Sequence, residues 1–144
     1  GDLIYVQPGV LHAIGEGLLL LEVQQPSDST FRIYDWDRVG LDGKKRPLHL
    51  DEALVCVDFN QKGPPPIQNQ ETSGPGFKMR AIAEGACIES CYLRVFTALD
   101  GKVVLKTAQG SYTLKRGDTF VAELKESWVK LLSGACVLIE ELPL

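Results

Sequence analysis

The feature that most constrains this chain is a repeat whose two copies differ in length. Residues 1–6 read GDLIYV and residues 117–122 read GDTFVA. Each run leads to an aliphatic segment ending in glutamate, GLLLLEV in the first copy and GACVLIEE in the second. His12 and Trp128 occupy the same offset from the opening glycine, from 1 to 12 and from 117 to 128. Such self-similarity predicts two related structural modules.

The two copies differ in what precedes the Gly-Asp pair. Strand-like sequence from Phe77 to Arg116 precedes the second pair, whereas the chain starts at the first pair. A sheet divided at this point exposes unpaired strand edges and an open core. We therefore expect the first module to be incomplete. An N-terminal portion of the same protein, or a second copy of the chain, is expected to cover its open edge.

Short aliphatic and aromatic runs separated by Gly, Pro and Ser predict an almost wholly β protein. In the first module we expect strands at 2–7, 17–24 and 29–36. In the second module we expect strands at 77–83, 89–98, 102–108, 110–115, 118–123, 128–132 and 135–141. The turn between two of them contains Asp100-Gly101. This pattern favours an antiparallel barrel or sandwich for the second module.

The two modules are joined by a segment that is unsuited to a core. Residues 60–76 contain four prolines and three glycines and almost nothing apolar, so we expect a surface connection there. The expected organisation is therefore an incomplete first module over 1–59, this connection, and a second module over 77–144. Within the first module, HLDEALVCVDF predicts a short helix that is capped by Asp51, with Leu54 and Val55 facing inward.

The charge pattern and the lengths of the apolar runs argue against several classes of function. The 19 acidic and 15 basic residues are interspersed and give a net charge of -4, so the sequence shows no basic stripe for a nucleic-acid backbone. The longest aliphatic run, 18–21, is far shorter than the roughly 20 residues that span a bilayer. Gly1-Asp2 leads directly into strand-like sequence, so we do not expect a targeting peptide in this segment. We expect a cytoplasmic protein that binds neither nucleic acid nor membrane.

The four cysteines do not form a common zinc or redox motif. None has the C-x-x-C spacing, so reduced and partly buried thiols are expected. If Cys87 and Cys91 share a strand, they lie about 13 Å apart at roughly 3.3 Å per residue. A disulfide between them is then excluded.

Two segments of the first module carry a resemblance to a known family. GDLIYVQPGVLHAIG resembles the second cupin motif, in which a histidine follows a Pro-Gly turn and points into the barrel. LLLLEVQQPSDSTFRIYDWDR, followed by GKKRPLHL, resembles class I mannose-6-phosphate isomerases. The resemblance is clearest over residues 1–55. It implies a cupin-type jelly roll for both modules, with the chain as a C-terminal portion of the enzyme and Trp128 at the place of the histidine in a metal-free second module.

The resemblance also implies a zinc site that this chain fills only in part. In the family, a glutamine, two histidines and a glutamate hold zinc for the interconversion of mannose 6-phosphate and fructose 6-phosphate. Only His12 matches one of these ligands, and the chain contains no Q-x-H motif. The remaining ligands are expected N-terminal to this chain, which should be nearly inactive alone. Without the resemblance, a single histidine among aliphatic residues is more often a hydrogen-bonded structural residue.

Arg32 aligns with an arginine that the family places beside the substrate, where it could stabilise developing negative charge or bind phosphate. The alternative is that Arg32 belongs to a set of surface ion pairs with its neighbours along the chain. On a regular strand Asp35 would lie on the opposite face, so both could not face one pocket. Glu22 is either a substrate-binding pocket residue or the end of a strand, and His49 is most simply a packed or capping residue.

Two functions of different classes fit these observations. The first is a zinc-dependent aldose–ketose isomerase of the mannose-6-phosphate type with a sugar phosphate as substrate. The second is a non-enzymatic cupin module that binds carbohydrate or dimerises through its open edge. Turnover restored by an added N-terminal segment would distinguish the first from the second.

Overall fold

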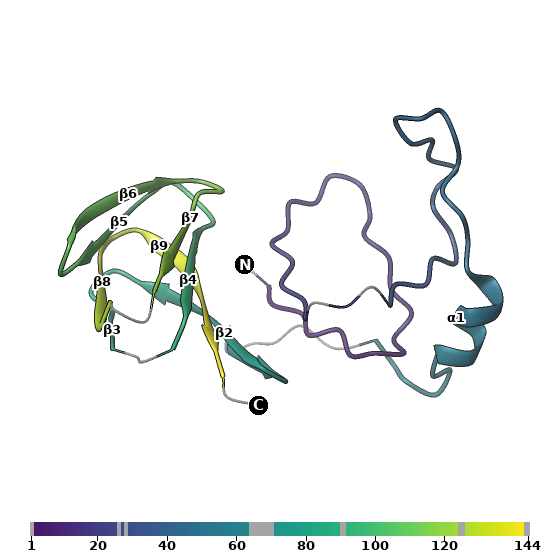
Figure 1. The fold of residues 1–144 in the computed structure, drawn as a ribbon, viewed down its shortest axis with the longest axis horizontal. Coiled ribbons are helices and arrows are strands. Elements are labelled where there is room, and N and C mark those ends of the chain that lie inside the picture. Colours follow the sequence, from purple (N-terminus) through teal and green to yellow (C-terminus); the bar gives the residue numbers. More distant parts are fainter. Residues whose placement is uncertain are drawn as a thin grey trace. The chain divides into compact units, whose positions relative to one another are not determined.

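The computed structural model describes residues 2–25, 27, 29–63, 71–89, 92–123 and 126–142. The chain divides into two compact units (Figure 1). The first, here called the N-terminal unit, comprises residues 4–65. The second, here called the jelly-roll unit, comprises residues 66–144 together with residues 1–3. Each unit is considered separately below.

The jelly-roll unit consists of two antiparallel sheets. One has the strand order β1-β2-β9-β4-β7 and the other β3-β8-β5-β6. The strand bounds are β1 Glu71–Gly74, β2 Phe77–Ala83, β3 Cys87–Glu89, β4 Arg94–Ala98, β5 Lys102–Thr107, β6 Gly110–Lys115, β7 Thr119–Ala122, β8 Trp128–Ser133 and β9 Ala135–Glu141.

The pairing of these strands is that of a long hairpin folded into two layers. The tight β5–β6 hairpin lies at its tip, and β4 with β7, β3 with β8 and β2 with β9 pair successively further from the tip. Because these pairs alternate between the two sheets, the topology is that of a jelly roll. The expectation of an all-β antiparallel sandwich of this type is therefore confirmed.

The core of the sandwich follows from alternation along the strands. On β5 the side chains at 103, 105 and 107 are buried while those at 102 and 106 are exposed, as expected for a sheet with one solvent-exposed face. β4 and β9 contribute Phe96 and Leu138, which are completely buried. The main apolar cluster comprises Ile82, Ile88, Phe96, Ala98, Val103, Leu105, Leu114, Ala122, Val129, Leu131, Cys136 and Leu138.

The strand boundaries differ from the prediction in two places. The expected strand at 89–98 is divided into β3 and β4, and part of the intervening segment lies outside the described residues. β1 lies inside the segment 60–76 that was expected to be a connection, and that prediction was wrong there. A polar run can form this strand because β1 is an edge strand that pairs only with β2. Its Glu71 also pairs with Lys78 at 2.8 Å.

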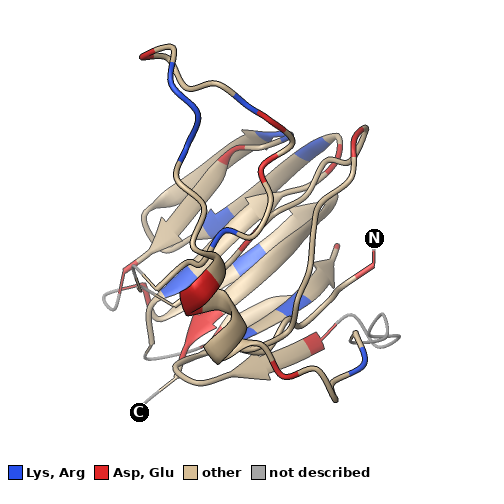
Figure 2. Ribbon diagram, turned by 90° about the vertical axis from the view of Figure 1, so that its right-hand side faces the viewer, with Lys and Arg blue, Asp and Glu red and all other residues tan. Residues whose placement is uncertain are grey.

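Pairing of the strands places lysines that are distant in the sequence on one face of the jelly-roll unit. Four exposed lysines lie on the outer face of the four-stranded sheet, and Figure 2 shows basic residues in blue along strands of the sandwich. Lys102 lies opposite Lys115, and Lys106 lies opposite Lys130. These lysines come from three strands, so only the register of the sheet brings them together.

The three strands expected at 2–7, 17–24 and 29–36 are absent from the described residues of the N-terminal unit, so these predictions were wrong. A strand requires a neighbour that accepts and donates its ladder hydrogen bonds. The described part of this unit contains only an isolated bridge between Val39 and Lys45. The aliphatic side chains at 18–21 are accordingly exposed, by 36% to 76%.

One helix, α1 (Leu50–Cys56), is present near the expected position. His49 occupies its N-cap position and makes no side-chain cap bond, whereas Asp51 and Glu52 lie in the first turn, which is red in Figure 2. Asp51 is therefore not the cap, and its carboxylate complements the helix dipole instead. Leu54 and Val55 are 60% and 86% exposed rather than inward-facing, because the short helix buries only Ala53.

No helix among the described residues has the length and apolar character needed to cross a membrane.

The described cysteines, Cys56, Cys87 and Cys136, are free thiols. The first two are exposed and Cys136 is buried in β9, so the expected partial burial holds only for one of them. The Cys87–Cys91 separation is not tested, because Cys91 lies outside the described residues. Burial raises the pKa of the Cys136 thiol to about 11.

We expect Cys136 to resist alkylation in the native protein at pH 8, because the thiolate is the reactive form and burial disfavours it. Cys56 and Cys87 should react first, as assigned by peptide mass spectrometry. A thiol with a raised folded-state pKa contributes stability below its unfolded pKa of about 8.5, and this contribution is lost as the pH rises towards 11. Equal labelling rates for Cys136 and Cys87 would contradict this assignment.

Candidate functional site

The polar cluster of the N-terminal unit is built around a tight turn at Trp36-Asp37. Both residues have φ of 54°, in the left-handed region that side chains rarely adopt. The turn is closed by a hydrogen bond from the Arg38 N–H to the Asp35 carbonyl oxygen, at 3.0 Å. This turn interrupts the alternation that a strand would impose. Asp35, Asp37 and Arg38 therefore line the same cavity.

Asp35 is the centre of the cluster and is only 8% exposed. Arg46 binds it with both arms of the guanidinium: Nε donates to Oδ2 at 2.7 Å, and Nη2 donates to Oδ1. Arg32 Nε lies 3.8 Å from Oδ1, so Arg32 and Asp35 do approach each other. The Arg46 hydrogen bond is the main reason that the pKa of Asp35 is lowered, with the charges of Arg46, Arg32 and Arg38 adding to it. Asp35 therefore remains ionised and partly neutralises the surrounding cations.

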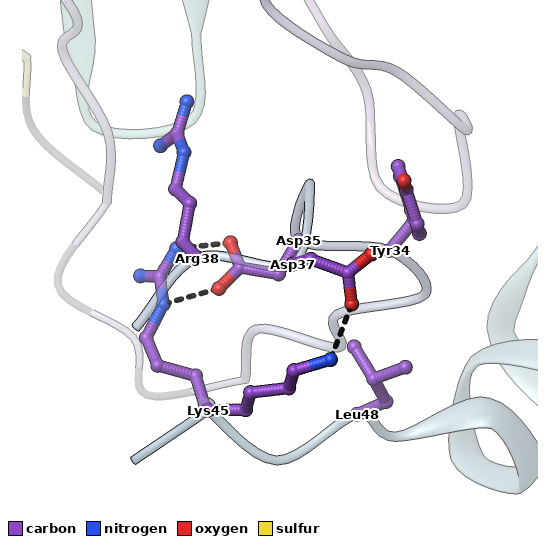
Figure 3. A pocket seen from close by; sticks show the side chains of 7 residues that line it. Tyr34, Asp35, Asp37, Arg38, Lys45 and Leu48 are labelled. Atoms are coloured by element: carbon purple, nitrogen blue, oxygen red, sulfur yellow. Dashed lines mark hydrogen bonds and ion pairs between the residues drawn. The ribbon is translucent and has the colours of Figure 1, made fainter. Parts of the chain in front are cut away.

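A second ion pair closes the other side of a small cavity of about 70 Å³ (Figure 3). Lys45 Nζ donates to Asp37 Oδ1 at 2.6 Å, which raises the pKa of Lys45. Both side chains are largely exposed, so this pair contributes little to stability. In Figure 3 the guanidinium of Arg38 extends away from Asp35, and no hydrogen bond or ion pair joins it to another described side chain.

Arg32 is held through its main chain by His49. Its N–H donates to Nδ1 of His49 at 3.1 Å, and its carbonyl oxygen accepts the His49 N–H at 2.8 Å. The Arg32 side chain donates to the Pro47 carbonyl oxygen at 3.4 Å. His49 also packs edge-on against Phe31, at 6.3 Å between ring centroids. His49 is thus a packed residue that positions Arg32, as one of its two sequence interpretations expected.

His12 lies on an exposed loop that begins at the Pro8-Gly9 turn. The turn is tied to the end of α1, because the Gly9 carbonyl oxygen accepts the Asp58 N–H at 3.0 Å. A side chain at Gly9 would place Cβ 3.1 Å from the Cys56 carbonyl oxygen, and φ is +85° there. His12 Nδ1 lies 2.9 Å from the Val10 carbonyl oxygen. Because a carbonyl can only accept, Nδ1 carries the proton of this bond, and Nε2 is the ring nitrogen left for a metal ion.

This arrangement fits one zinc ligand rather than a complete zinc site. A ring nitrogen that donates to a carbonyl is the usual way in which proteins orient a metal-binding imidazole. Among the residues that the structure describes, however, no three His, Cys, Asp or Glu side chains gather to hold a metal ion.

The three candidate residues do not form one shared pocket in the described structure. Arg32 lies beside Asp35 and His49, whereas the other two, His12 and Glu22, are exposed. Glu22 has no ion pair within the part of the chain that is described. The sequence interpretation missed Arg46, although the basic run Lys44-Lys45-Arg46 was part of the motif and could have indicated it.

Comparison with curated proteins finds relatives that are all named as mannose-6-phosphate isomerases. The putative mannose-6-phosphate isomerase YvyI of Bacillus subtilis is 32% identical over 156 residues, which cover 96% of this chain and 48% of that protein. Mannose-6-phosphate isomerase ManA of Bacillus subtilis is 50% identical over 58 residues, or 40% of this chain and 18% of that protein. The chain thus spans less than half the length of these relatives. No protein-family model matches the chain.

Solved structures show the same fold. The mannose 6-phosphate isomerase from Bacillus subtilis superposes with a TM-score of 0.55 at 23% identity, over 81% of this chain and 41% of that one. A putative mannosephosphate isomerase from Archaeoglobus fulgidus gives a TM-score of 0.53 at 11% identity, over 65% of this chain and 32% of that one. At these identities the solved structures show only that the fold is shared. The evidence for relatedness comes from the sequence identities to the curated proteins. Over almost its whole length, the chain is therefore similar in sequence to part of a mannose-6-phosphate isomerase, and over shorter segments it is similar to three more proteins of that name.

Proposed function

We propose that this chain is the C-terminal portion of a mannose-6-phosphate isomerase, an aldose–ketose isomerase that interconverts mannose 6-phosphate and fructose 6-phosphate. The main support is the 32% identity to YvyI, which extends over 96% of the chain rather than over one motif. The relatives that are matched over shorter segments carry the same name at 50% identity or more. The N-terminal portion would complete both the first module and the active site.

In this proposal Arg32 acts directly on the substrate. The isomerisation moves a proton between adjacent carbons through an enediol-like intermediate, so negative charge develops on a substrate oxygen. The Arg32 guanidinium has donors beyond those used towards Pro47 and Asp35, and it could stabilise that charge or bind phosphate. His49 binds both the N–H and the carbonyl oxygen of Arg32. Arg46 occupies the carboxylate of Asp35, which leaves the Arg32 guanidinium less strongly bound to Asp35. Arg32 is thus positioned by two independent contacts.

His12 is the zinc ligand that this chain contributes, through Nε2. Zinc, when bound, supplies polarisation of the substrate carbonyl. In this proposal the remaining ligands come from the N-terminal portion; among the described residues, no three His, Cys, Asp or Glu side chains gather to hold a metal ion. Glu22 is proposed to join the substrate site only when residues 17–24 form a strand that pairs with a strand of the N-terminal portion.

Complementation tests this proposal. The 144-residue chain should show neither stoichiometric zinc nor turnover of fructose 6-phosphate when it is alone. Addition of the part of YvyI that this chain does not cover should restore both. The restored activity should be lost in His12→Ala and should fall by at least about a hundredfold in Arg32→Ala, as for other single electrostatic contacts to a developing charge.

The other histidine provides a matched control for the zinc ligand. His49→Gln should keep the zinc content of the complemented protein, although its turnover should decrease because Arg32 is less well positioned. Full zinc binding and turnover by the isolated chain would refute the incompleteness of the site. A complemented protein that keeps its zinc after His12→Ala would refute the ligand assignment.

A further inference from the structure

The jelly-roll unit contains a second cavity that the proposed isomerase site does not use. It has a volume of about 140 Å³ and lies where β6 and β7, the edge strands of the two sheets, approach each other. Tyr112 and Phe120 line it with rings whose centroids are 4.6 Å apart, at an interplanar angle of 40°. Both residues are half-buried and belong to the inward-facing sets of their strands. The cavity therefore offers an aromatic wall.

Hydrogen-bonding groups surround this wall. Gln109 contributes from the β5–β6 turn, and Glu123 and Glu126 follow β7. Glu126 is only 5% exposed, yet its carboxylate has no hydrogen bond or ion pair with any other described residue. Its oxygens are not among the fully buried side-chain atoms that lack a partner, which agrees with their place on the wall of the cavity. The Glu126 carboxylate is thus an acceptor placed at a cavity without a described donor.

Arg94 determines which kind of donor suits the cavity. Its guanidinium is fully buried and donates to the main-chain carbonyl oxygen of Glu126. Burial lowers the pKa of Arg94, and the charges of Glu140 and Glu126 oppose that shift. A cation is therefore already present beside Glu126, so a second full positive charge is not needed there. What the carboxylate lacks is a set of neutral donors. An anionic ligand, by contrast, would be repelled by Glu123 and Glu126.

We propose that this cavity binds a neutral polyhydroxylated ligand, such as an unphosphorylated hexose, and discriminates against the sugar phosphate. The C–H face of a sugar ring packs on the aromatic wall, and its hydroxyl groups donate to the carboxylates and to Gln109. The N-terminal unit has the opposite character, with Arg32, Arg38 and Arg46 around a single buried carboxylate. This proposal does not rest on the isomerase function, because it uses only residues of the jelly-roll unit.

Titration of the full chain with D-mannose, followed by backbone amide NMR, tests the site. We expect saturable shifts at residues 109, 112, 120 and 126, and at least about tenfold weaker binding of mannose 6-phosphate, a difference worth about 1.4 kcal/mol. Tyr112→Ala and Glu126→Gln should each weaken mannose binding about tenfold. Thr113→Ala is the matched control, because Thr113 adjoins Tyr112 on β6 and faces the opposite side of the sheet.

Three results would overturn the proposal. The first is the absence of saturable shifts with mannose in a chain whose spectrum is well dispersed. The second is binding of mannose 6-phosphate, or of ethylammonium, as tightly as mannose, since the cavity would then select another chemistry. The third is unchanged mannose affinity in Tyr112→Ala. Because Tyr112 is half-buried on an edge strand, this variant should fold and keeps the proposal testable even if Glu126→Gln does not fold.

Discussion

Replacing Gly134 with alanine is expected to destabilise the jelly-roll unit by about 3 kcal/mol or more. Gly134 connects β8 and β9 with φ of +83°, where an L side chain is strained by about 1–2 kcal/mol. A Cβ atom there would also lie 2.6 Å from the Lys102 carbonyl oxygen and 3.1 Å from Val103 Cγ2. Overpacking of this kind adds about 1–3 kcal/mol. Urea unfolding, followed by the β-sheet signal in circular dichroism, measures the change.

Gly101→Ala separates the two contributions to this effect. Gly101 also has a left-handed φ, +61°, but nothing lies within 4 Å of the position that a Cβ atom would occupy. The loss should therefore be limited to the backbone strain, about 1–2 kcal/mol. Equal losses for the two variants would mean that the close contact between Gly134 and β5 does not contribute.

The second large effect is expected at Arg94. This side chain is fully buried on β4, and Nη1 donates to the Ile88 carbonyl oxygen at 3.1 Å while Nη2 donates to that of Glu126. It thereby connects β4 to β3 and to the segment before β8. Arg94→Ala removes two charged hydrogen bonds, each worth about 1.5–3 kcal/mol, and leaves a void. We expect a loss of about 3–5 kcal/mol in the free energy of unfolding.

Arg94→Met tests whether packing or hydrogen bonding dominates. Methionine fills much of the same volume and removes a buried charge whose Nε has no hydrogen-bond partner. Replacing a buried charge with an apolar side chain is often tolerated. The methionine variant should therefore be more stable than the alanine variant, although the Ile88 and Glu126 carbonyl groups lose their donor. A methionine variant as unstable as the alanine variant would show that the hydrogen bonds carry most of the effect.

The second module was largely predictable from its sequence because its information is local. Strands β2 and β9 have the expected bounds, 77–83 and 135–141, since alternating apolar residues end at turn residues on both sides. The Asp100-Gly101 turn is also present, with the Asp100 side chain accepting the Gly101 N–H at 2.9 Å. What could not be predicted was the register. The four lysines on the outer sheet face and the cavity between β6 and β7 both depend on pairings between distant segments.

The first module shows the limit of the same reasoning. Residues 17–24 are as strand-like as any segment of the chain, but a strand forms only when another strand satisfies its backbone groups. The expectation about the relative placement of Arg32 and Asp35 failed for a related reason. Arg32 and Asp35 were assigned to opposite faces on the assumption of a regular strand, but residues 29–36 form no strand and Arg32 Nε lies 3.8 Å from Asp35 Oδ1. The complementation experiment tests whether His12, Arg32 and Glu22 act together.

The position of β9 has a consequence for how the jelly-roll unit folds. β9 lies between β2 and β4, so it supplies ladder partners to both, and it pairs Phe77 with Glu141 across most of the unit. During synthesis the five-stranded sheet therefore cannot close until the final strand has left the ribosome. Contacts this distant in sequence make folding slow, typically on a scale of milliseconds to seconds. The apolar faces of β2 and β4 are exposed during that interval, when a nascent chain is most prone to aggregate.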